Sequence, residues 1–371
     1  MTGTSHSTAT GEKLTSEEIG SISTPFGLLG AALDHAQTHL FTAGMDGQIE
    51  QIDLQSQERT LIGKHESYAS NIIQHPDPGL VVSSGYDGLI IWHDLRQRRP
   101  VQVVEAHRFW SWSLALSPNG RSLASVTGQY QSGGYRYEPA SETEPSLKIF
   151  DADSGVATHE LSHIPPVTAL AFSPDSRYVA AGNLMGEIRI YDLKSSRQVA
   201  QWTTPDFTSW GIIKSHHYIG GIFDLFFTAD GDDLVACGMG PMRDPMAGHG
   251  VQTWQRFRWR TAQTEPIAAI DPDSTGKGLM ETLALDSPRD RFVMAGRLAQ
   301  GQWNTGIFDL PSGRLLHSID TKMRTTKALF TKDGNQLILC GAKSQKGPKD
   351  GVWPDFGQVL RFRLDSSSPG A

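Results

Sequence analysis

The chain has little cysteine, no excess of positive charge and no long hydrophobic run. Its 371 residues include two cysteines and carry a formal net charge of -7. This acidic balance argues against a nucleic-acid partner. No run reaches the roughly eighteen apolar residues of a membrane span, so we expect no membrane insertion. The first residues lack the basic start and apolar stretch of a signal peptide, and we expect a cytoplasmic protein.

What the sequence does contain is a short apolar run, ending in a small residue and a glycine, that occurs seven times. The repeats lie about forty to sixty residues apart, a period typical of small sheets repeated around an axis. The sequence therefore predicts an all-β fold: a seven-bladed propeller of four-stranded antiparallel blades. The glycines that end the seven runs are Gly44, Gly85, Gly128, Gly182, Gly238, Gly296 and Gly341.

The two cysteines, Cys237 and Cys340, occupy the same position in the fifth and seventh runs. Equivalent positions two blades apart are too distant for a disulfide, which needs a short separation between Cα atoms. We expect both thiols to be reduced and buried, as in a reducing compartment. No Cys-x-x-Cys-His stretch is present, which excludes covalent c-type haem, and no other motif indicates a cofactor.

Each repeat reads as a strand, a turn such as Ser173-Pro174-Asp175, the strand ending in glycine, and a third strand ending in an apolar or aromatic residue and Asp. In this pattern the chain resembles the WD40 repeat family over roughly residues 25 to 365. The family's Trp-Asp pair is replaced by pairs such as His93-Asp94 and Tyr191-Asp192, and its repeat histidine corresponds to His65, His107 and His163. The resemblance implies structural roles for these histidines. No repeat displays the family's Asp-His-Ser-Trp hydrogen-bond network complete.

Counting strands predicts how the ring closes. In the last repeat, the third strand, Val359–Phe362, is not followed by a fourth strand. A segment from earlier in the chain must therefore pair with it, because otherwise its edge would stay open. Residues 13–24 are the candidate, and the WD40 resemblance implies the same closure. We expect a disordered tail over residues 1–12, one propeller over 13–365 and a second disordered tail over 366–371.

Five connections are longer than their counterparts in other repeats. Nine residues separate Gly44 from Asp53, whereas twenty-three separate Gly128 from Asp151. The other expansions fall at 202–227, 239–250, 296–309 and 342–357. In a four-stranded antiparallel blade, these connections all leave the same face. Enlarged loops on one face of a repeat protein are typical of a binding side.

We therefore predict a non-enzymatic scaffold that binds a protein or peptide on this face. Aromatic and arginine side chains are frequent interface anchors. The candidates in or beside the connections are Trp110, Tyr135, Trp210, Arg243, Trp303 and Trp353. The third-repeat connection is acidic, with Glu138, Glu142 and Glu144, and the seventh is basic, with Lys343, Lys346 and Lys349.

An alternative function is an enzyme or ligand sensor with a small-molecule or metal pocket at the mouth of the central channel. His216, His217 and His249 could converge there as metal ligands, with Asp244 and Arg243 nearby. No motif places a nucleophile, a base or a cofactor, so we assign no catalytic residue and favour the scaffold.

Overall fold

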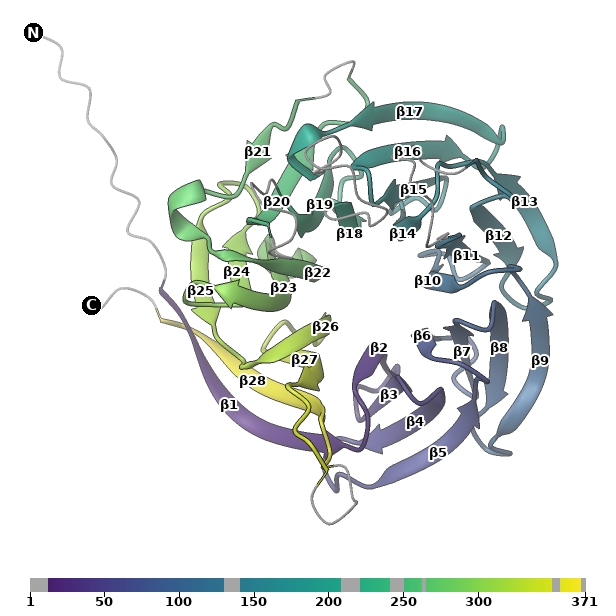
Figure 1. The fold of residues 1–371 in the computed structure, drawn as a ribbon, viewed down its shortest axis with the longest axis horizontal. Coiled ribbons are helices and arrows are strands. Elements are labelled where there is room, and N and C mark those ends of the chain that lie inside the picture. Colours follow the sequence, from purple (N-terminus) through teal and green to yellow (C-terminus); the bar gives the residue numbers. More distant parts are fainter. Residues whose placement is uncertain are drawn as a thin grey trace, which may run out of the picture.

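The computed structural model describes residues 13–129, 141–207, 221–240, 250–261, 265–348 and 354–367. In these ranges the chain forms seven four-stranded antiparallel sheets around a central opening (Figure 1). The predicted seven-bladed propeller is confirmed. The described residues contain no helix with the length and apolar character needed to cross a membrane.

The first three blades follow one another along the chain, each running from the channel outward. Blade one contains β2 (Leu28–Leu33), β3 (His39–Gly44), β4 (Gln48–Asp53) and β5 (Arg59–Lys64). Blade two contains β6 (Ala69–Gln74), β7 (Leu80–Gly85), β8 (Leu89–Asp94) and β9 (Arg99–Glu105). Blade three contains β10 (Ser111–Leu116), β11 (Ser122–Thr127), β12 (Leu147–Asp151) and β13 (Ala157–Leu161).

Blades four and five keep this order but differ in their outer strands. Blade four contains β14 (Val167–Phe172), β15 (Tyr178–Asn183), β16 (Glu187–Asp192) and β17 (Arg197–Thr203), followed by the 3₁₀ turn η1 (Pro205–Phe207). Blade five contains β18 (Gly221–Phe227), β19 (Leu234–Met239), β20 (Gln252–Phe257) and a two-residue outer strand, β21 (Ala268–Ala269).

Blade six has the longest hairpin. It contains β22 (Lys277–Asp286), β23 (Arg291–Gln300), β24 (Thr305–Asp309) and β25 (Leu315–Ile319), with 3₁₀ turns η3 (Pro272–Ser274) and η4 (Ser287–Arg289). The extra residues predicted between 296 and 309 partly extend β23, which pairs with β22 from Lys277 to Asp286. This expansion is therefore regular sheet as well as loop.

Blade seven closes the ring. It contains β26 (Met323–Phe330), β27 (Gln336–Lys343) and β28 (Gly357–Ser367), and its fourth strand is β1 (Lys13–Thr24). The pairing runs from Lys13 opposite Ser367 to Thr24 opposite Gly357, which confirms the predicted closure. Ser366 and Ser367 belong to this pair, so the predicted tail at 366–371 begins too early. Residues 1–12 and 368–371 lie outside the described ranges.

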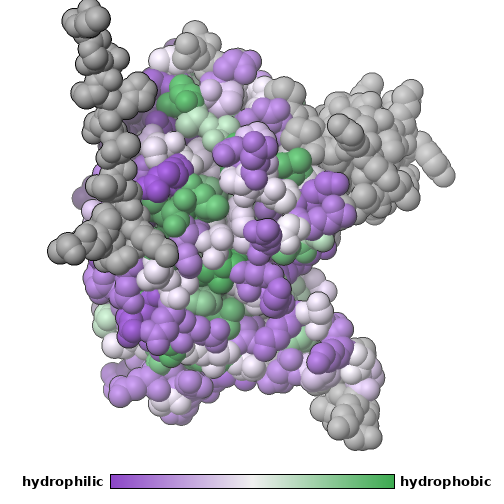
Figure 2. Space-filling model, turned by 90° about the vertical axis from the view of Figure 1, so that its left-hand side faces the viewer, coloured by the Kyte–Doolittle hydropathy of each residue, from purple (hydrophilic) through white to green (hydrophobic). Residues whose placement is uncertain are grey.

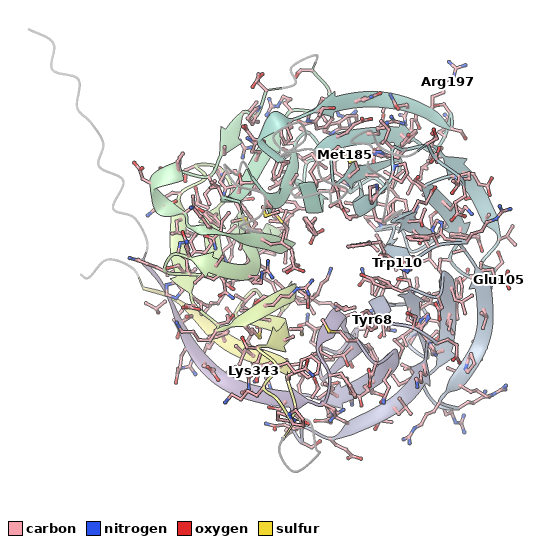
Figure 3. The ribbon with its side chains drawn as sticks, in the orientation of Figure 1. Tyr68, Glu105, Trp110, Met185, Arg197 and Lys343 are labelled. Atoms are coloured by element: carbon pink, nitrogen blue, oxygen red, sulfur yellow. The ribbon has the colours of Figure 1, made fainter. Side chains whose placement is uncertain are left out.

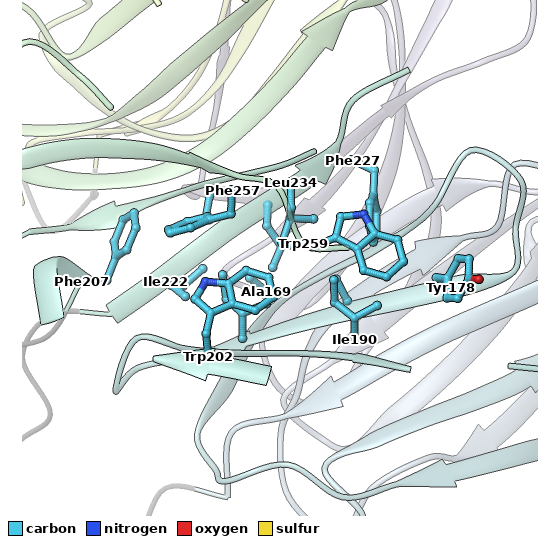
Figure 4. Close-up of a cluster of buried hydrophobic side chains, with 14 residues drawn as sticks. Ala169, Tyr178, Ile190, Trp202, Phe207, Ile222, Phe227, Leu234, Phe257 and Trp259 are labelled. Atoms are coloured by element: carbon cyan, nitrogen blue, oxygen red, sulfur yellow. The ribbon is translucent and has the colours of Figure 1, made fainter. Parts of the chain in front are cut away.

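The hydrophobic core lies mainly between adjacent sheets. Between blades four and five, Trp202, Phe207 and Phe257 lie at the end of the cluster that contains Ile222, and Trp259 packs against Tyr178 and Phe227 at the other end (Figure 4). The flank near β25 and β1 mixes hydrophilic with smaller hydrophobic areas (Figure 2). Cys237 and Cys340 are fully buried free thiols, as predicted. Small side chains at these positions allow neighbouring sheets to approach closely.

The first strand of every blade carries a β-bulge near its start. In blade one, Leu28 pairs with Gly44 and Gly30 with Ala43, so Leu29 has no partner in the register. The same one-residue skip occurs in the other six inner pairs. All seven skipped residues line a cavity in the channel. They are Leu29, Ser70, Trp112, Thr168, Phe223, Glu281 and Thr326.

The three repeat histidines are buried and hydrogen-bonded, which confirms their structural role. In blade two, His65 Nδ1 lies 2.9 Å from Asp87, and its Nε2 lies 2.8 Å from Ser83 Oγ. Ser83 Oγ also lies 2.8 Å from His93 Nε2. As expected, blade two lacks the tryptophan of the family's Asp-His-Ser-Trp set. Blade two has an unbroken network in which His93 replaces the tryptophan.

Neighbouring strands in each blade are antiparallel. The connection from second to third strand and the connection to the next blade therefore leave the same face. We call this the long-loop face, because the strand ends from which all five enlarged connections leave are on it. The opposite face carries the short turns between first and second strands.

Candidate functional site

The long-loop face carries a cluster of aromatic side chains beside the channel, which we call the aromatic ridge. It consists of Tyr68, Tyr86, Phe109, Trp110 and Trp112. Tyr68 precedes β6, Tyr86 follows β7, and the other three lie at or just before the start of β10. Figure 3 shows Tyr68 and Trp110 near the central opening.

A tight turn in blade two positions the ridge. Gly88 has a φ of 80°, and a Cβ atom there would lie 2.1 Å from the carbonyl oxygen of His107, so only glycine fits. The Gly88 carbonyl accepts the amides of Ala106 and His107, at 3.0 and 3.1 Å. This fixes the loop that carries Trp110 against the turn that carries Tyr86. The Tyr86 amide also donates to the Tyr68 carbonyl at 2.8 Å.

The rings of the ridge stack on one another. The centroids of Tyr86 and Trp110 are 4.8 Å apart, with an angle of 12° between the ring planes. Tyr68 lies 5.6 Å from Tyr86 at the outer end, and its side chain is 49% exposed. Stacked rings with a limited choice of rotamers form a preorganised contact surface.

An ion pair lies beside the ridge in the channel. Arg324 Nη2 donates to Glu281 Oε2 at 2.7 Å, and the Glu281 side chain is almost buried. Burial raises the pKa of Tyr86 to about 12, with an opposing effect from Arg324 and a further increase from Glu281. Tyr86 is therefore a neutral phenol at physiological pH. The cavity below measures ≈ 100 Å³, enough for a few waters but not for a large ligand.

The buried carboxyl of Asp224 in the channel has a structural role. Its two oxygens accept the amides of Leu225 and Leu283, at 2.9 and 2.8 Å, and so tie blade five to blade six. Burial raises the pKa of Asp224, while Lys327 and the backbone hydrogen bonds lower it. Both oxygens are engaged, which makes Asp224 a poor base for catalysis.

The predicted anchor residues fall into three groups. Trp110 lies in the aromatic ridge. Trp303 is 5% exposed, packs against Phe308 and donates from Nε1 to the Ser274 carbonyl, so it fills the core below its own loop instead of forming a surface anchor. Tyr135, Trp210, Arg243 and Trp353 lie outside the described residues.

The residues of the alternative channel-mouth site also fall outside the described ranges: His216, His217, His249, Asp244 and Arg243. Among the side chains that the structure does describe, no group of three or more His, Cys, Asp or Glu residues could hold a metal ion.

The sequence prediction missed Tyr68 and Tyr86. Both lie in connections of ordinary length, whereas the prediction concentrated on the enlarged ones. A usable signal was present: Tyr86 follows a run-ending glycine and Tyr68 follows the repeat histidine His65 by three residues. Both positions belong to connections that leave the long-loop face.

Comparison with known proteins supports the repeat assignment. The family model of the WD domain, G-beta repeat, matches residues 155–192. This match runs from β13, the outer strand of blade three, through β16, the third strand of blade four. Each sequence repeat thus begins with the outer strand of one blade and continues into the next blade. For the same reason β1, which precedes the first blade, is the outer strand of blade seven.

Several curated proteins are similar to part of the chain. Pre-mRNA-processing factor 19 of Bos taurus is 28% identical over 180 residues, which cover 47% of this chain and 33% of that protein. The U3 small nucleolar RNA-associated protein 4 homolog of Mus musculus is 22% identical over 273 residues, or 73% and 35% of the two chains. Small ribosomal subunit protein RACK1y of Oryza sativa subsp. japonica is 28% identical over 141 residues, or 36% and 37%.

The chain thus spans about a third of the length of the relatives it matches first. With a matching WD repeat across blades three and four, and seven four-stranded sheets closed by an N-terminal strand, the chain is a seven-bladed propeller that carries a WD40 repeat and is similar to proteins of that family.

Proposed function

We propose that the protein is a non-enzymatic scaffold that binds a protein or peptide partner on its long-loop face, with the aromatic ridge as the main contact. The observation that carries this proposal is the stacking of Tyr68, Tyr86 and Trp110 at the channel mouth, on the face from which the enlarged connections leave their strands. Tyrosine and tryptophan provide most of the binding energy in many protein interfaces.

Two further observations support a scaffold. Glu281 is ion-paired, and both carboxylate oxygens of Asp224 accept backbone hydrogen bonds. Among the described residues, neither carboxylate in the channel is therefore free to act as a general base. The net charge of -7 disfavours a nucleic-acid partner. The two free buried thiols suit a reducing compartment, and we retain a cytoplasmic location as part of the proposal.

The proposal is tested by affinity capture from the native organism with three immobilised baits. The first is the unchanged protein, and the second carries Tyr68→Ala and Trp110→Ala. The third is a matched control with Val103→Ala and Val199→Ala, two residues exposed on outer strands of blades two and four. We expect partners held by the first and third baits to be reduced at least about tenfold on the second.

Thermal melting of the three baits serves as the folding control. Equal recovery on the ridge variant, with an unchanged melting transition, would show that the ridge is not the contact surface. Failure of the unchanged protein to retain any partner above a blank resin would contradict the scaffold itself.

A further inference from the structure

A second feature of the long-loop face lies over blades six, seven and one. It is a groove of ≈ 500 Å³, which we call the basic groove. Its lining contains four cationic residues, Arg297, Lys322, Arg324 and Lys343, and one carboxylate, Asp320. This local excess of positive charge occurs in a chain whose net charge is -7. Figure 3 shows Lys343 over blade seven, away from Trp110.

Two cations in this groove retain donors for a ligand. Arg324 uses Nε and Nη2 to bind Glu281, and no hydrogen bond to another described residue uses its Nη1. Its side chain is 41% exposed, whereas that of Glu281 is 8% exposed. The Nζ of Lys343 likewise forms no hydrogen bond or ion pair with any residue in the described ranges. Lys322 pairs with Asp320 on an exposed loop.

The acidic connection of blade three is arranged differently. Glu144 accepts the Arg108 amide at 2.9 Å and pairs with Lys148 at 3.2 Å. Glu142 accepts the amides of Ser146 and His163, at 2.7 and 3.0 Å. These carboxylates are satisfied within the fold. Unlike Arg324 and Lys343, they offer no free charge to a ligand.

The groove also has an apolar wall. Phe356 contributes to it and packs edge-on against Phe26, with ring centroids 6.1 Å apart. Met45, Leu298 and Met323 continue the lining. A ligand with a carboxylate next to an apolar side chain would match both the donors and this wall. Nucleic acid fits less well, because Phe356 is the single aromatic residue among the lining residues named for this groove, successive bases stack on several rings, and the net charge of the chain is negative.

We infer that the basic groove binds an acidic segment of the partner polypeptide, with Asp or Glu carboxylates at Arg324 and Lys343 and a neighbouring apolar side chain against Phe356. This inference rests on the proposed scaffold function and adds the chemistry of the partner. Because the groove is positive although the net charge of the chain is negative, it also attracts an acidic segment to the long-loop face.

The test measures binding of a short fluorescent peptide in which glutamates flank one leucine, by fluorescence anisotropy with the full chain. A control peptide carries glutamine in place of every glutamate. We expect the acidic peptide to bind at least about tenfold more tightly, and its affinity to fall as salt rises from about 50 to about 200 mM.

The protein variant for this test is Lys322→Glu with Lys343→Glu. Both residues are exposed, so the fold is retained, and Arg324 is left in place to keep Glu281 paired. The matched control is Lys194→Glu, an exposed lysine that follows β16 on the opposite face. We expect the double variant to lose at least about tenfold in affinity and the control to change by less than about twofold.

Three outcomes would overturn the inference: equal binding of the two peptides, unchanged affinity of the double variant, or complete displacement of the acidic peptide by an equal concentration of single-stranded RNA. The Tyr68→Ala, Trp110→Ala protein separates the two proposals. If that protein loses partner capture and the unchanged protein does not bind the acidic peptide, the ridge is supported as the contact surface and the groove proposal is wrong. If that protein still captures the partner and the unchanged protein binds the acidic peptide, the groove is supported and the ridge is not.

Discussion

At the residue scale, Ser83 is the centre of the network in blade two. Its hydroxyl lies 2.8 Å from a ring nitrogen of His65 and 2.8 Å from one of His93. Ser83→Ala would leave two buried imidazole nitrogens without partners, and we expect the free energy of unfolding to fall by about 2 kcal/mol or more. Urea denaturation followed by circular dichroism measures the change.

The control for this prediction is Ser23→Ala, at an exposed position of β1 where no described hydrogen bond uses the hydroxyl. It should change the free energy of unfolding by less than about 0.5 kcal/mol. Equal effects of the two substitutions would mean that the network adds nothing to stability.

Three buried histidines predict a dependence of stability on pH. Burial lowers the pKa of His93, His107 and His163 from 6.5 to about 3, with smaller effects from His65, Lys148 and Arg189 respectively. The folded state holds these rings neutral, whereas the unfolded chain takes up protons below about pH 6.5. Their contribution to stability is complete above that pH and is lost as the pH falls toward about 3.

We expect each of the three histidines to remove about 1 kcal/mol from the free energy of unfolding by about pH 5.5. The lowered pKa of Asp87 acts in the same direction only below its ordinary value of 3.8. Urea midpoints between about pH 7.5 and pH 5.5 measure the loss. His163→Gln should reduce the pH dependence by about a third, even if its stability is lower throughout. A midpoint independent of pH would contradict the argument.

At the element scale, β1 should be as important for stability as a core strand. Leu14 and Ile22 are 4% and 5% exposed, and they pack in two different clusters against β28 and its neighbours. Ile22→Ala removes buried methyl groups, and we expect a loss of about 2–4 kcal/mol in the free energy of unfolding. Chemical denaturation measures it.

The adjacent Ser23→Ala again serves as the control, since Ser23 points to the exposed side of the same strand. If Ile22→Ala destabilised the protein no more than Ser23→Ala, the closing strand would be a peripheral element that the ring does not need.

Individual elements differ in how far the sequence predicts them. The strands ending in glycine were predictable because their composition is local, and the closing strand followed from counting. The bulges were not, because Leu29, Ser70 and Glu281 share no chemistry that distinguishes the skipped position. In the candidate site, Trp110 was identified from its loop. The prediction for Trp303 was wrong, because loop length does not reveal whether an aromatic ring turns inward and packs below its own connection.

At the scale of the whole molecule, the two thiols provide a test of ring cooperativity. Cys237 lies in blade five and Cys340 in blade seven, both fully buried. Burial raises the pKa of Cys340 to about 12 and that of Cys237 well above its usual range. Neither should react with iodoacetamide in the folded protein, since the thiolate is the reactive form.

In a closed ring every blade packs against two neighbours, so no blade is a terminal unit from which unfolding can begin on its own. We therefore expect both cysteines to become reactive over the same urea range, together with the loss of the circular dichroism signal. Mass spectrometry of the alkylated peptides distinguishes the two sites. Separate midpoints for the two thiols would show that blades five and seven open independently.

The seven bulges have a consequence for how this channel can change. A residue outside the pairing register does not share the alternation that directs its neighbours into one inter-sheet layer or the other. Leu29 can therefore be exchanged for a side chain of another size or charge at small cost to its own ladder, whereas the Thr168 hydroxyl donates to the Ile222 carbonyl of the next blade. The channel wall thus has one such position per blade, and those without a bond to the next blade, such as Leu29, are where new specificity can arise while the scaffold stays the same.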